Sequence, residues 1–441
     1  MKNRILKKGF LLTFFVLFTA LFLAGCYTPN PRYIAWLKEQ EQKRISQLFE
    51  SKNTATEFVF SADKKVLIKA PGNLKGVYVV PDGVQVIERH AFLGCKDLTE
   101  VKLPESLKEI REEAFFNCTG LKSIRIPGKV RKISEGTFYY CKSLKNITLP
   151  EKLKEIDKNA FYGCDRLLDI KLPRGLQELG EGAFQYCSGL SGRIDVPEDI
   201  SEIKAYTFYG CSQVVIITLP SGLESIGEYA FDNCQSLIEI EIPETVDHIG
   251  EGAFRSCLSL EKVKIPERIR KIEFRTFEYC SKLQEVIFPA GLKHIGKHAF
   301  ACCKLETLDL PKNLKTIGEY AFLQNHRLVK LEIPDYVDHV GGAAFSGCGY
   351  LRSVKLSKRM TVVEAGTFSG CFYLKDVTIP EGIKEIKDYA FSGCKHLEEI
   401  ILPKSVARIE TNAFNKSACE EQVFFDYRHL YKNDRDENKK K

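Results

Sequence analysis

The sequence repeats itself about every 23 residues, and this self-similarity limits the possible folds more than any other feature. A phenylalanine marks the period, at positions Phe92, Phe115, Phe138, Phe161, Phe184, Phe208, Phe231, Phe254, Phe277, Phe300, Phe322, Phe345, Phe368, Phe391 and Phe414. The step from Phe184 to Phe208 has one extra residue, and the step from Phe300 to Phe322 lacks one. Such a period is the signature of a solenoid, because no single unit can bury its own apolar edge. We therefore expect one elongated repeat domain of about 15 units.

Each unit contains two short alternating patterns separated by a proline. Val101 to Leu103 alternates apolar and polar residues, which predicts a half-buried strand, and Pro104 ends it because proline has no N–H to donate. Leu107 to Ile110 predicts a second short strand. A polar turn and an Ala-Phe pair follow, where we expect a short helical turn that ends near the cysteine. Parallel stacking would place the strands about 4.8 Å apart and the phenylalanine rings in one buried column.

The chain begins with a targeting segment, residues 1–25. Its basic start is formed by Lys2, Arg4, Lys7 and Lys8. The apolar run from Phe10 to Leu23 is short for a spanning helix and is typical of a signal peptide. It ends in Leu23-Ala24-Gly25-Cys26, which resembles the lipobox of bacterial lipoproteins. The resemblance implies that Cys26 becomes the lipidated first residue. An ordinary signal peptide that happens to contain a cysteine is the alternative.

Three further regions follow the signal peptide. Residues 26–57 form a linker that begins with prolines and continues with apolar residues at helical spacing, so we expect a helix there. Residues 58–414 form the repeat solenoid, and its first unit looks like a hairpin that caps the exposed core. Residues 415–441 leave the repeat pattern and are expected to form a C-terminal cap and a charged tail.

The repeated residues themselves are similar to those of a known family. The unit Ile-Pro-x-x-(Leu/Val)-x-x-Ile-Gly-x-x-Ala-Phe-x-x-Cys-x-x-Leu resembles the BspA-like, or Treponema-type, leucine-rich repeat over roughly residues 58–414. The resemblance implies a surface-exposed protein, lipid-anchored in the outer membrane. Such proteins are implicated in adhesion to host matrix or cell-surface proteins, including fibronectin and fibrinogen. A periplasm-facing envelope scaffold that binds bacterial partners is the alternative. The shared motif is structural, so it assigns no binding residues.

Composition and motifs argue against several other functions. The formal net charge is +7, but the first 25 residues hold four basic residues and no acidic ones, so the remaining chain carries only +3. A nearly balanced chain is not typical of a nucleic-acid binder. The sequence contains no Walker loop, HExxH, CxxC or GxSxG motif, and its acidic residues are spread along the repeats. We therefore expect no enzymatic activity, no cofactor and no metal site.

The cysteines follow the repeat as well. Thirteen of the sixteen occupy one position of the unit: Cys95, Cys118, Cys141, Cys164, Cys187, Cys211, Cys234, Cys257, Cys280, Cys303, Cys348, Cys371 and Cys394. Asn325 takes that position in one interior unit. Disulfides are the usual reading of many cysteines in an exported protein, and zinc is a further alternative. Parallel stacking, however, gives every cysteine the same orientation. We therefore favour small, buried thiols that face backbone groups.

Positions that vary between units are the candidates for binding. Aromatic residues crowd the positions just after the repeat phenylalanine in the N-terminal half: Phe116, Tyr139, Tyr140, Tyr162, Tyr186 and Tyr209. Val215 and Ile216 are apolar at positions that are polar in most other units. Tyrosine is enriched at binding surfaces because it combines apolar area with a polar tip. These eight residues are the predicted protein-binding surface; the alternative is that the aromatics only pack between turns.

The outward position of the first strand carries a second signal. It is basic early in the array, at Lys102, Arg125 and Lys171, and becomes mixed later, with Asp195 and Glu241. A charged strip of this kind is either a solvated strand face or a docking strip for an acidic segment of a partner.

Overall fold

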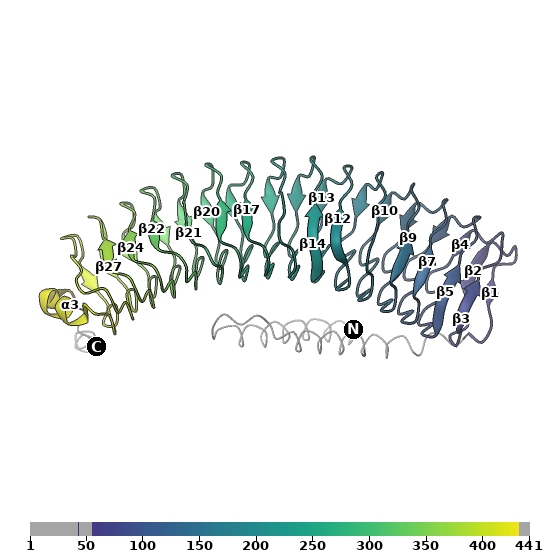
Figure 1. The fold of residues 1–441 in the computed structure, drawn as a ribbon, viewed down its shortest axis with the longest axis horizontal. Helices are drawn as coiled ribbons and strands as arrows, with labels where there is room; N and C mark the ends of the chain where they lie inside the picture. The colour runs from purple at the N-terminus through teal and green to yellow at the C-terminus, as the bar shows by residue number, and fades with distance from the viewer. Residues whose placement is uncertain (1–42, 44–54, 432–441) are drawn as a thin grey trace, which may run out of the picture. The chain divides into compact units, whose positions relative to one another are not determined.

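A computed structural model describes residue 43 and residues 55–431. The predicted signal peptide, residues 1–25, and the predicted lipidation site, Cys26, lie outside these residues. Within residues 55–431 the chain winds into successive coils that stack side by side, and each coil adds short strands to parallel ladders (Figure 1). The predicted leucine-rich-repeat solenoid of about 15 units is therefore confirmed.

The first ladder lies just before the repeat proline. Its strands are β3 (Gly76–Val79), β5 (Leu98–Lys102), β7 (Ser123–Arg125), β9 (Asn146–Thr148), β12 (Ser191–Asp195), β14 (Gln213–Thr218), β17 (Lys262–Lys264), β19 (Glu285–Ile287), β22 (Lys330–Glu332), β24 (Ser353–Lys355) and β26 (Asp376–Thr378). They form the sheets β3-β5-β7-β9, β12-β14, β17-β19 and β22-β24-β26, all parallel. Partners are one repeat apart, as in Ser123 with Asn146.

The second ladder follows the proline, and its strands after the first coil have two residues each. They are β4 (Val86–Ile87), β6 (Glu109–Ile110), β8 (Lys132–Ile133), β10 (Glu155–Ile156), β11 (Glu178–Leu179), β13 (Glu202–Ile203), β15 (Ser225–Ile226), β16 (His248–Ile249), β18 (Lys271–Ile272), β20 (His294–Ile295), β21 (Thr316–Ile317), β23 (His339–Val340), β25 (Val362–Val363), β27 (Glu385–Ile386) and β28 (Arg408–Ile409). In each, the second residue is apolar and buried. This is the half-buried alternation that the sequence predicts.

Different elements cover the two ends of the stack. At the start, β1 (Val59–Phe60) and β2 (Val66–Lys69) form an antiparallel hairpin, and β2 extends the second ladder by pairing with β4. At the end, α3 (Glu420–Asp426) and η1 (Arg428–Leu430) follow the last coil. The side chain of Val423 is buried there, and the hydroxyl of Tyr427 accepts a hydrogen bond from the amide of Leu402 at 3.2 Å. These elements thus shield core edges that stacking leaves open.

The phenylalanine column is the centre of the core. Consecutive rings from Phe92 to Phe414 stack with centroids 4.8–5.8 Å apart and interplanar angles of 2–14°. All of these side chains are buried. The predicted stack is confirmed, and its spacing lies within the range that aromatic pairs favour.

The segment around each phenylalanine differs from the helical turn expected from the sequence. The amides of Glu113, Phe115 and Asn117 donate to carbonyl groups of the next coil at 2.7–2.9 Å. Only alternate amides, such as that of Phe116 to the carbonyl of Glu113, close a local turn. Glu113 and Asn117 have φ of 56° and 58°, in the left-handed region. Tight turns with alternating backbone conformations replace the helix, and their outward amides form a third set of bonds between coils.

The cysteine column joins neighbouring coils through its thiols. Cys118 donates to the carbonyl oxygen of Phe92 at 3.0 Å, and Cys141 donates to that of Phe115 at 3.2 Å. From Cys118 to Cys394, each repeat cysteine donates to the phenylalanine carbonyl of the preceding coil. Burial raises the pKa of the Cys348 thiol to about 12. The prediction of buried thiols facing backbone groups is confirmed.

Asn325 compensates for the missing residue of the preceding coil. In coils of normal length, the leucine after the cysteine donates its amide to the cysteine carbonyl three residues back, as Leu121 does to Cys118. Leu305 follows Cys303 by only two residues and instead donates to Oδ1 of Asn325 at 3.2 Å. The asparagine therefore replaces cysteine where the chain has an additional buried amide to satisfy.

Candidate protein-binding surfaces

The structure brings the six predicted aromatic residues together. Phe116, Tyr139 and Tyr162 occupy the same position in consecutive coils and stack, with centroid distances of 4.9 and 4.4 Å and interplanar angles of 6° and 3°. The ring of Tyr140 meets those of Tyr139 and Tyr162 edge-on, at 5.0 and 5.4 Å. Parallel coil stacking causes this, because residues one repeat apart become neighbours.

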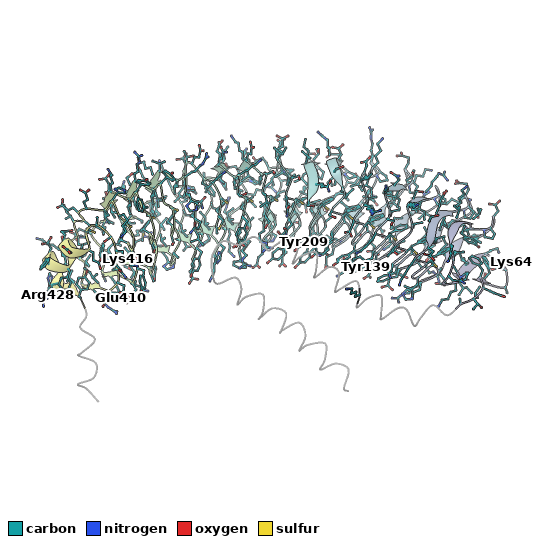
Figure 2. All side chains as sticks on the ribbon, turned by 60° about the horizontal axis from the view of Figure 1, so that its bottom comes forward. Lys64, Tyr139, Tyr209, Glu410, Lys416 and Arg428 are labelled. Atoms are coloured by element: carbon teal, nitrogen blue, oxygen red, sulfur yellow. The ribbon has the colours of Figure 1, made fainter. Side chains whose placement is uncertain are left out.

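Two further tyrosines continue the group into later coils. Tyr186 packs edge-on against Tyr162 at 5.5 Å and against Tyr209 at 5.1 Å. In the orientation of Figure 2, Tyr139 and Tyr209 lie on the same side of the stack. We call Phe116, Tyr139, Tyr140, Tyr162, Tyr186 and Tyr209 the aromatic cluster.

Much of the aromatic cluster is covered. Phe116 and Tyr140 are buried, while Tyr139, Tyr162, Tyr186 and Tyr209 are half-buried. Burial raises the pKa of the Tyr162 and Tyr209 hydroxyls far above the ordinary value. The rings thus pack between turns, and only the half-buried tyrosines offer area to a partner.

The geometry of Tyr140 and Tyr186 depends on glycines in the following coil. Both tyrosines have left-handed φ angles, 56° and 61°. A Cβ atom added to Gly163 would lie 2.5 Å from Cδ1 of Tyr140, and one added to Gly210 would lie 2.8 Å from Cδ1 of Tyr186. The pairing of a tyrosine with a glycine one repeat later is a sequence signal that periodicity alone does not show.

Val215 and Ile216 do not belong to the aromatic cluster. They lie on β14 of the first ladder and are half-buried. The amide of Ile238 donates to the carbonyl of Val215 at 3.1 Å, and the Ile238 side chain is 46% exposed. The two predicted residues therefore join Ile238 in a separate apolar spot.

Sequence reasoning missed a buried group of charges that continues the row of the aromatic cluster. The position after the repeat phenylalanine, occupied by Tyr162 and Tyr209 in earlier coils, holds Asp232, Arg255 and Glu278 in three later coils. These three side chains are only 1–6% exposed. Nε of Arg255 lies 3.1 Å from Oδ2 of Asp232. The signal was the change of residue type at this one position.

Two further side chains approach the buried Glu278. Arg275 Nε lies 3.3 Å from one carboxylate oxygen, and His298 Nδ1 lies 3.4 Å from the other. Burial raises the pKa of Asp232 to about 6 and that of Glu278 to about 7, although the neighbouring arginines oppose the shift. Burial also lowers the pKa of His298 to about 4. Burial therefore makes both carboxyl groups easier to protonate than an exposed Asp or Glu.

An exposed aromatic group in the last coils was also missed. The ring of Tyr373 stacks between Tyr350, at 5.5 Å, and His396, at 5.0 Å. Phe372 meets Tyr373 and His396 edge-on. Tyr350 is 56% exposed and Phe372 is 44% exposed. The signal was aromatic residues one and two places after the repeat cysteine, where most other units have polar or small residues.

Comparison with known families identifies the repeat. A family model described as BspA type leucine rich repeat region matches residues 73–191, 201–329 and 323–427, in six copies. The chain belongs to this family. The resemblance seen in the repeat unit is thereby confirmed. BspA-type repeats therefore account for most of the solenoid.

Solved structures include one with the same fold and a second that is similar in sequence. A leucine-rich repeat protein from Bacteroides ovatus is 26% identical, with a TM-score of 0.67 over 83% of this chain and 99% of that chain. A leucine rich cell surface protein from Faecalibacterium prausnitzii is also 26% identical, with a TM-score of 0.43 over 87% of this chain and 94% of that chain. No functionally curated protein matches the chain.

Two other kinds of feature are absent from residue 43 and residues 55–431. Over this part of the chain, no helix is both long enough and apolar enough to cross a membrane. The same residues contain no group of three or more histidine, cysteine or acidic side chains arranged to hold a metal ion. The surfaces described above are the candidate protein-binding sites in this part of the chain.

Proposed function

We propose that this protein is a lipid-anchored bacterial surface protein that binds other proteins and acts as an adhesin for host extracellular-matrix or cell-surface proteins. Membership of the BspA-type family carries the proposal. A relative with 26% identity is described as a cell surface protein. A solenoid supports this role because its stacked coils present an extended surface on which the variable positions of many units act together.

The lipid anchor is part of the proposal. Cys26 stands at the end of a basic and apolar leader and would carry the acyl chains. Each buried CH₂ group contributes roughly 0.8 kcal/mol, so several chains on one cysteine would hold the protein firmly on the membrane. Mass spectrometry of the mature N-terminus tests this. A free, unmodified N-terminal residue at another position would contradict it.

The aromatic cluster is the proposed contact surface, with Val215 and Ile216 as a second apolar contact. Tyr139, Tyr162, Tyr186 and Tyr209 are half-buried, so each combines a fixed ring with some accessible area. Rings fixed by packing lose little conformational entropy on binding, which favours them as anchors.

The location is tested by treating intact cells with protease and detecting the repeat domain before and after. Loss of the domain while a periplasmic control protein survives is the expected result. Protection until the envelope is broken would replace the adhesin proposal with the second candidate, a periplasm-facing scaffold for bacterial partners. We propose no enzymatic role, because the variable positions form extended rows rather than a cluster of reactive groups.

The contact surface is tested with the triple variant Tyr139→Ala, Tyr162→Ala, Tyr209→Ala. Surface plasmon resonance against fibronectin and fibrinogen should show binding at least ten-fold weaker. The matched control replaces the exposed tyrosines Tyr336 and Tyr389 by alanine and should bind normally. Because the cluster also packs between turns, a triple Tyr→Phe variant serves as the folding check. Unchanged binding by a folded triple alanine variant would remove the cluster from the proposal.

A further inference from the structure

Two neighbouring coils present a first-ladder face that is basic and free of acidic residues. Residues 118–127 contain Lys122 and Arg125, residues 141–150 contain Lys142 and Lys145, and neither stretch contains Asp or Glu. Lys102 on β5 precedes them. We call Lys102, Lys122, Arg125 and Lys145 the basic face, and all four side chains are exposed.

Strand pairing arranges these cations in two rows. The amide of Lys145 donates to the carbonyl of Lys122 at 2.9 Å, so these two residues are neighbours across coils. The β5–β7 register pairs Val101 with Ile124, which places Lys102 beside Arg125. Neighbouring strands are about 4.8 Å apart, so each row holds two charges at close range.

A shallow groove lies at the basic face. It has a volume of about 350 Å³ and is lined by the cations Lys102 and Arg125, by one acid, Glu100, and by the polar side chains of Ser123, Asn146 and Thr148. Hydroxyl and amide groups both donate and accept hydrogen bonds. The groove therefore combines positive charge with groups that can bond a peptide backbone.

The cations of this face are not neutralised by the protein itself. Lys102, Lys122 and Lys145 make no ion pair with any residue in the described part of the chain. Arg125 pairs with Glu105 at 2.6 Å, but both side chains are more than 60% exposed, and such pairs are weak.

Cations in later coils of the same ladder are paired. Lys262 lies 2.8 Å from Glu285, Lys264 lies 2.5 Å from Glu244, and Lys330 lies 2.6 Å from Glu332. Like charges placed side by side repel one another, and a bound opposite charge offsets this repulsion. The basic face differs from these coils because Lys102, Lys122 and Lys145 have no acidic partner among the described residues, which suits it to an anionic partner.

We propose that the basic face binds a short acidic segment of a partner protein. The inference rests on the proposed protein-binding function and names the chemistry of one partner segment. Electrostatic complementarity of this kind speeds association and selects the partner.

The length of the basic face favours a peptide over a long polyanion. It covers three coils, roughly 10 Å across, and an extended peptide of about three to four residues spans that distance at about 3.3 Å per residue. Further along the outward position stand Asp195 and Glu241, which would repel a nucleic acid or a long sulfated glycan lying along the stack.

The test uses the full-length purified protein and a fluorescein-labelled peptide of sequence Gly-Ser-Glu-Ser-Glu-Ser-Glu-Ser-Glu-Gly, with fluorescence anisotropy as the readout. The basic-face variant is Lys102→Ser, Lys122→Ser, Lys145→Ser. The matched control is Lys262→Ser, Lys264→Ser, Lys330→Ser, which removes the same charge from the same ladder. We expect at least ten-fold weaker binding for the first variant and less than a two-fold change for the control.

Several outcomes would overturn the proposal. One is the absence of peptide binding by the wild type, and another is an equal loss in both variants, which would show only a general charge effect. A third is a heparin dodecasaccharide that binds more tightly than the peptide and loses binding in the basic-face variant, because the partner would then be a glycan.

Whole cells separate this inference from the proposed function. If the peptide does not bind but cells still capture fibronectin or fibrinogen, the proposal that the basic face binds an acidic segment is wrong and the adhesin proposal stands. If the peptide binds as expected but cells capture neither host protein, the basic face stands and the adhesin proposal fails.

Discussion

Asn325→Cys restores the repeat consensus and, by the reasoning above, should destabilise the protein. The replacement thiol can donate to the carbonyl of Phe300, as the other repeat cysteines do to theirs, but it offers no acceptor equivalent to Oδ1. The amide of Leu305, a fully buried residue, would lose its partner. An unsatisfied buried donor costs about 1–3 kcal/mol, so we expect the local free energy of opening to fall by that amount.

Native-state hydrogen exchange with mass spectrometry is the appropriate assay, because a long repeat array need not unfold in two states. Exchange should accelerate in the coils around Cys303 and Asn325 and stay unchanged in distant coils.

Two further variants test whether Asn325 compensates for the missing residue. Inserting one serine between Lys304 and Leu305 restores the normal spacing, and Asn325→Cys should then be close to neutral. Cys348→Asn places an asparagine next to a coil of normal length, where no additional amide needs an acceptor, and should destabilise. The explanation is wrong if Asn325→Cys is neutral in the unmodified chain. It is also wrong if Asn325→Cys destabilises the chain with the inserted serine by the same amount.

Three other predictions follow from the core and the missed features. Phe231→Ala, in the middle of the ring column, should reduce the local free energy of opening by about 3–5 kcal/mol, as measured by native-state hydrogen exchange. The raised pKa values of Asp232 and Glu278, about 6 and about 7, mean that the folded state binds protons which the unfolded state releases. Stability from these groups should be complete below their unfolded pKa values and be lost as the pH rises through about 7, and Asp232→Asn with Glu278→Gln should flatten the pH profile of the melting temperature. Gly163→Ala should displace the Tyr140 ring and strain a backbone with φ of 69°, which near-ultraviolet circular dichroism and a lower melting temperature would report.

The fold could be predicted closely from the sequence because every unit repeats the same pattern of buried residues. The position of Phe115 and its equivalents gave the ring column, and that of Cys118 gave the thiol column. The turn was predicted as helical because Ala-Phe in a polar segment has no local signal for the left-handed conformation. That conformation is stabilised by amides that bond the next coil, as at Glu113 and Asn117. Such bonds depend on stacking and are not visible in one unit.

The candidate surfaces were predictable in composition but not in exposure. The period brings Phe116, Tyr139 and Tyr162 together, as expected from parallel stacking. Their burial depends on the left-handed geometry of Tyr140 and on the space that Gly163 leaves, which are relations between coils. The burial of Asp232 was also not predictable, because a charged residue at a variable position usually faces solvent.

The position directly after the repeat phenylalanine now shows how one backbone carries different chemistry along its length. It holds Phe116, Tyr139, Tyr162 and Tyr209, with Gln185 in the unit of Phe184, then the charged residues Asp232 to Glu278, and then serine in the units of Phe345, Phe368 and Phe391. In a solenoid each coil contacts only its neighbours, so a change at this position acts over one or two coils. Effects of variants in the aromatic cluster and in the charged group should therefore add, except where Tyr209 adjoins Asp232. We expect a measurable coupling energy between Tyr209 and Asp232 and none between Tyr139 and Glu278. That result would show that the aromatic cluster and the charged group act independently except where they meet.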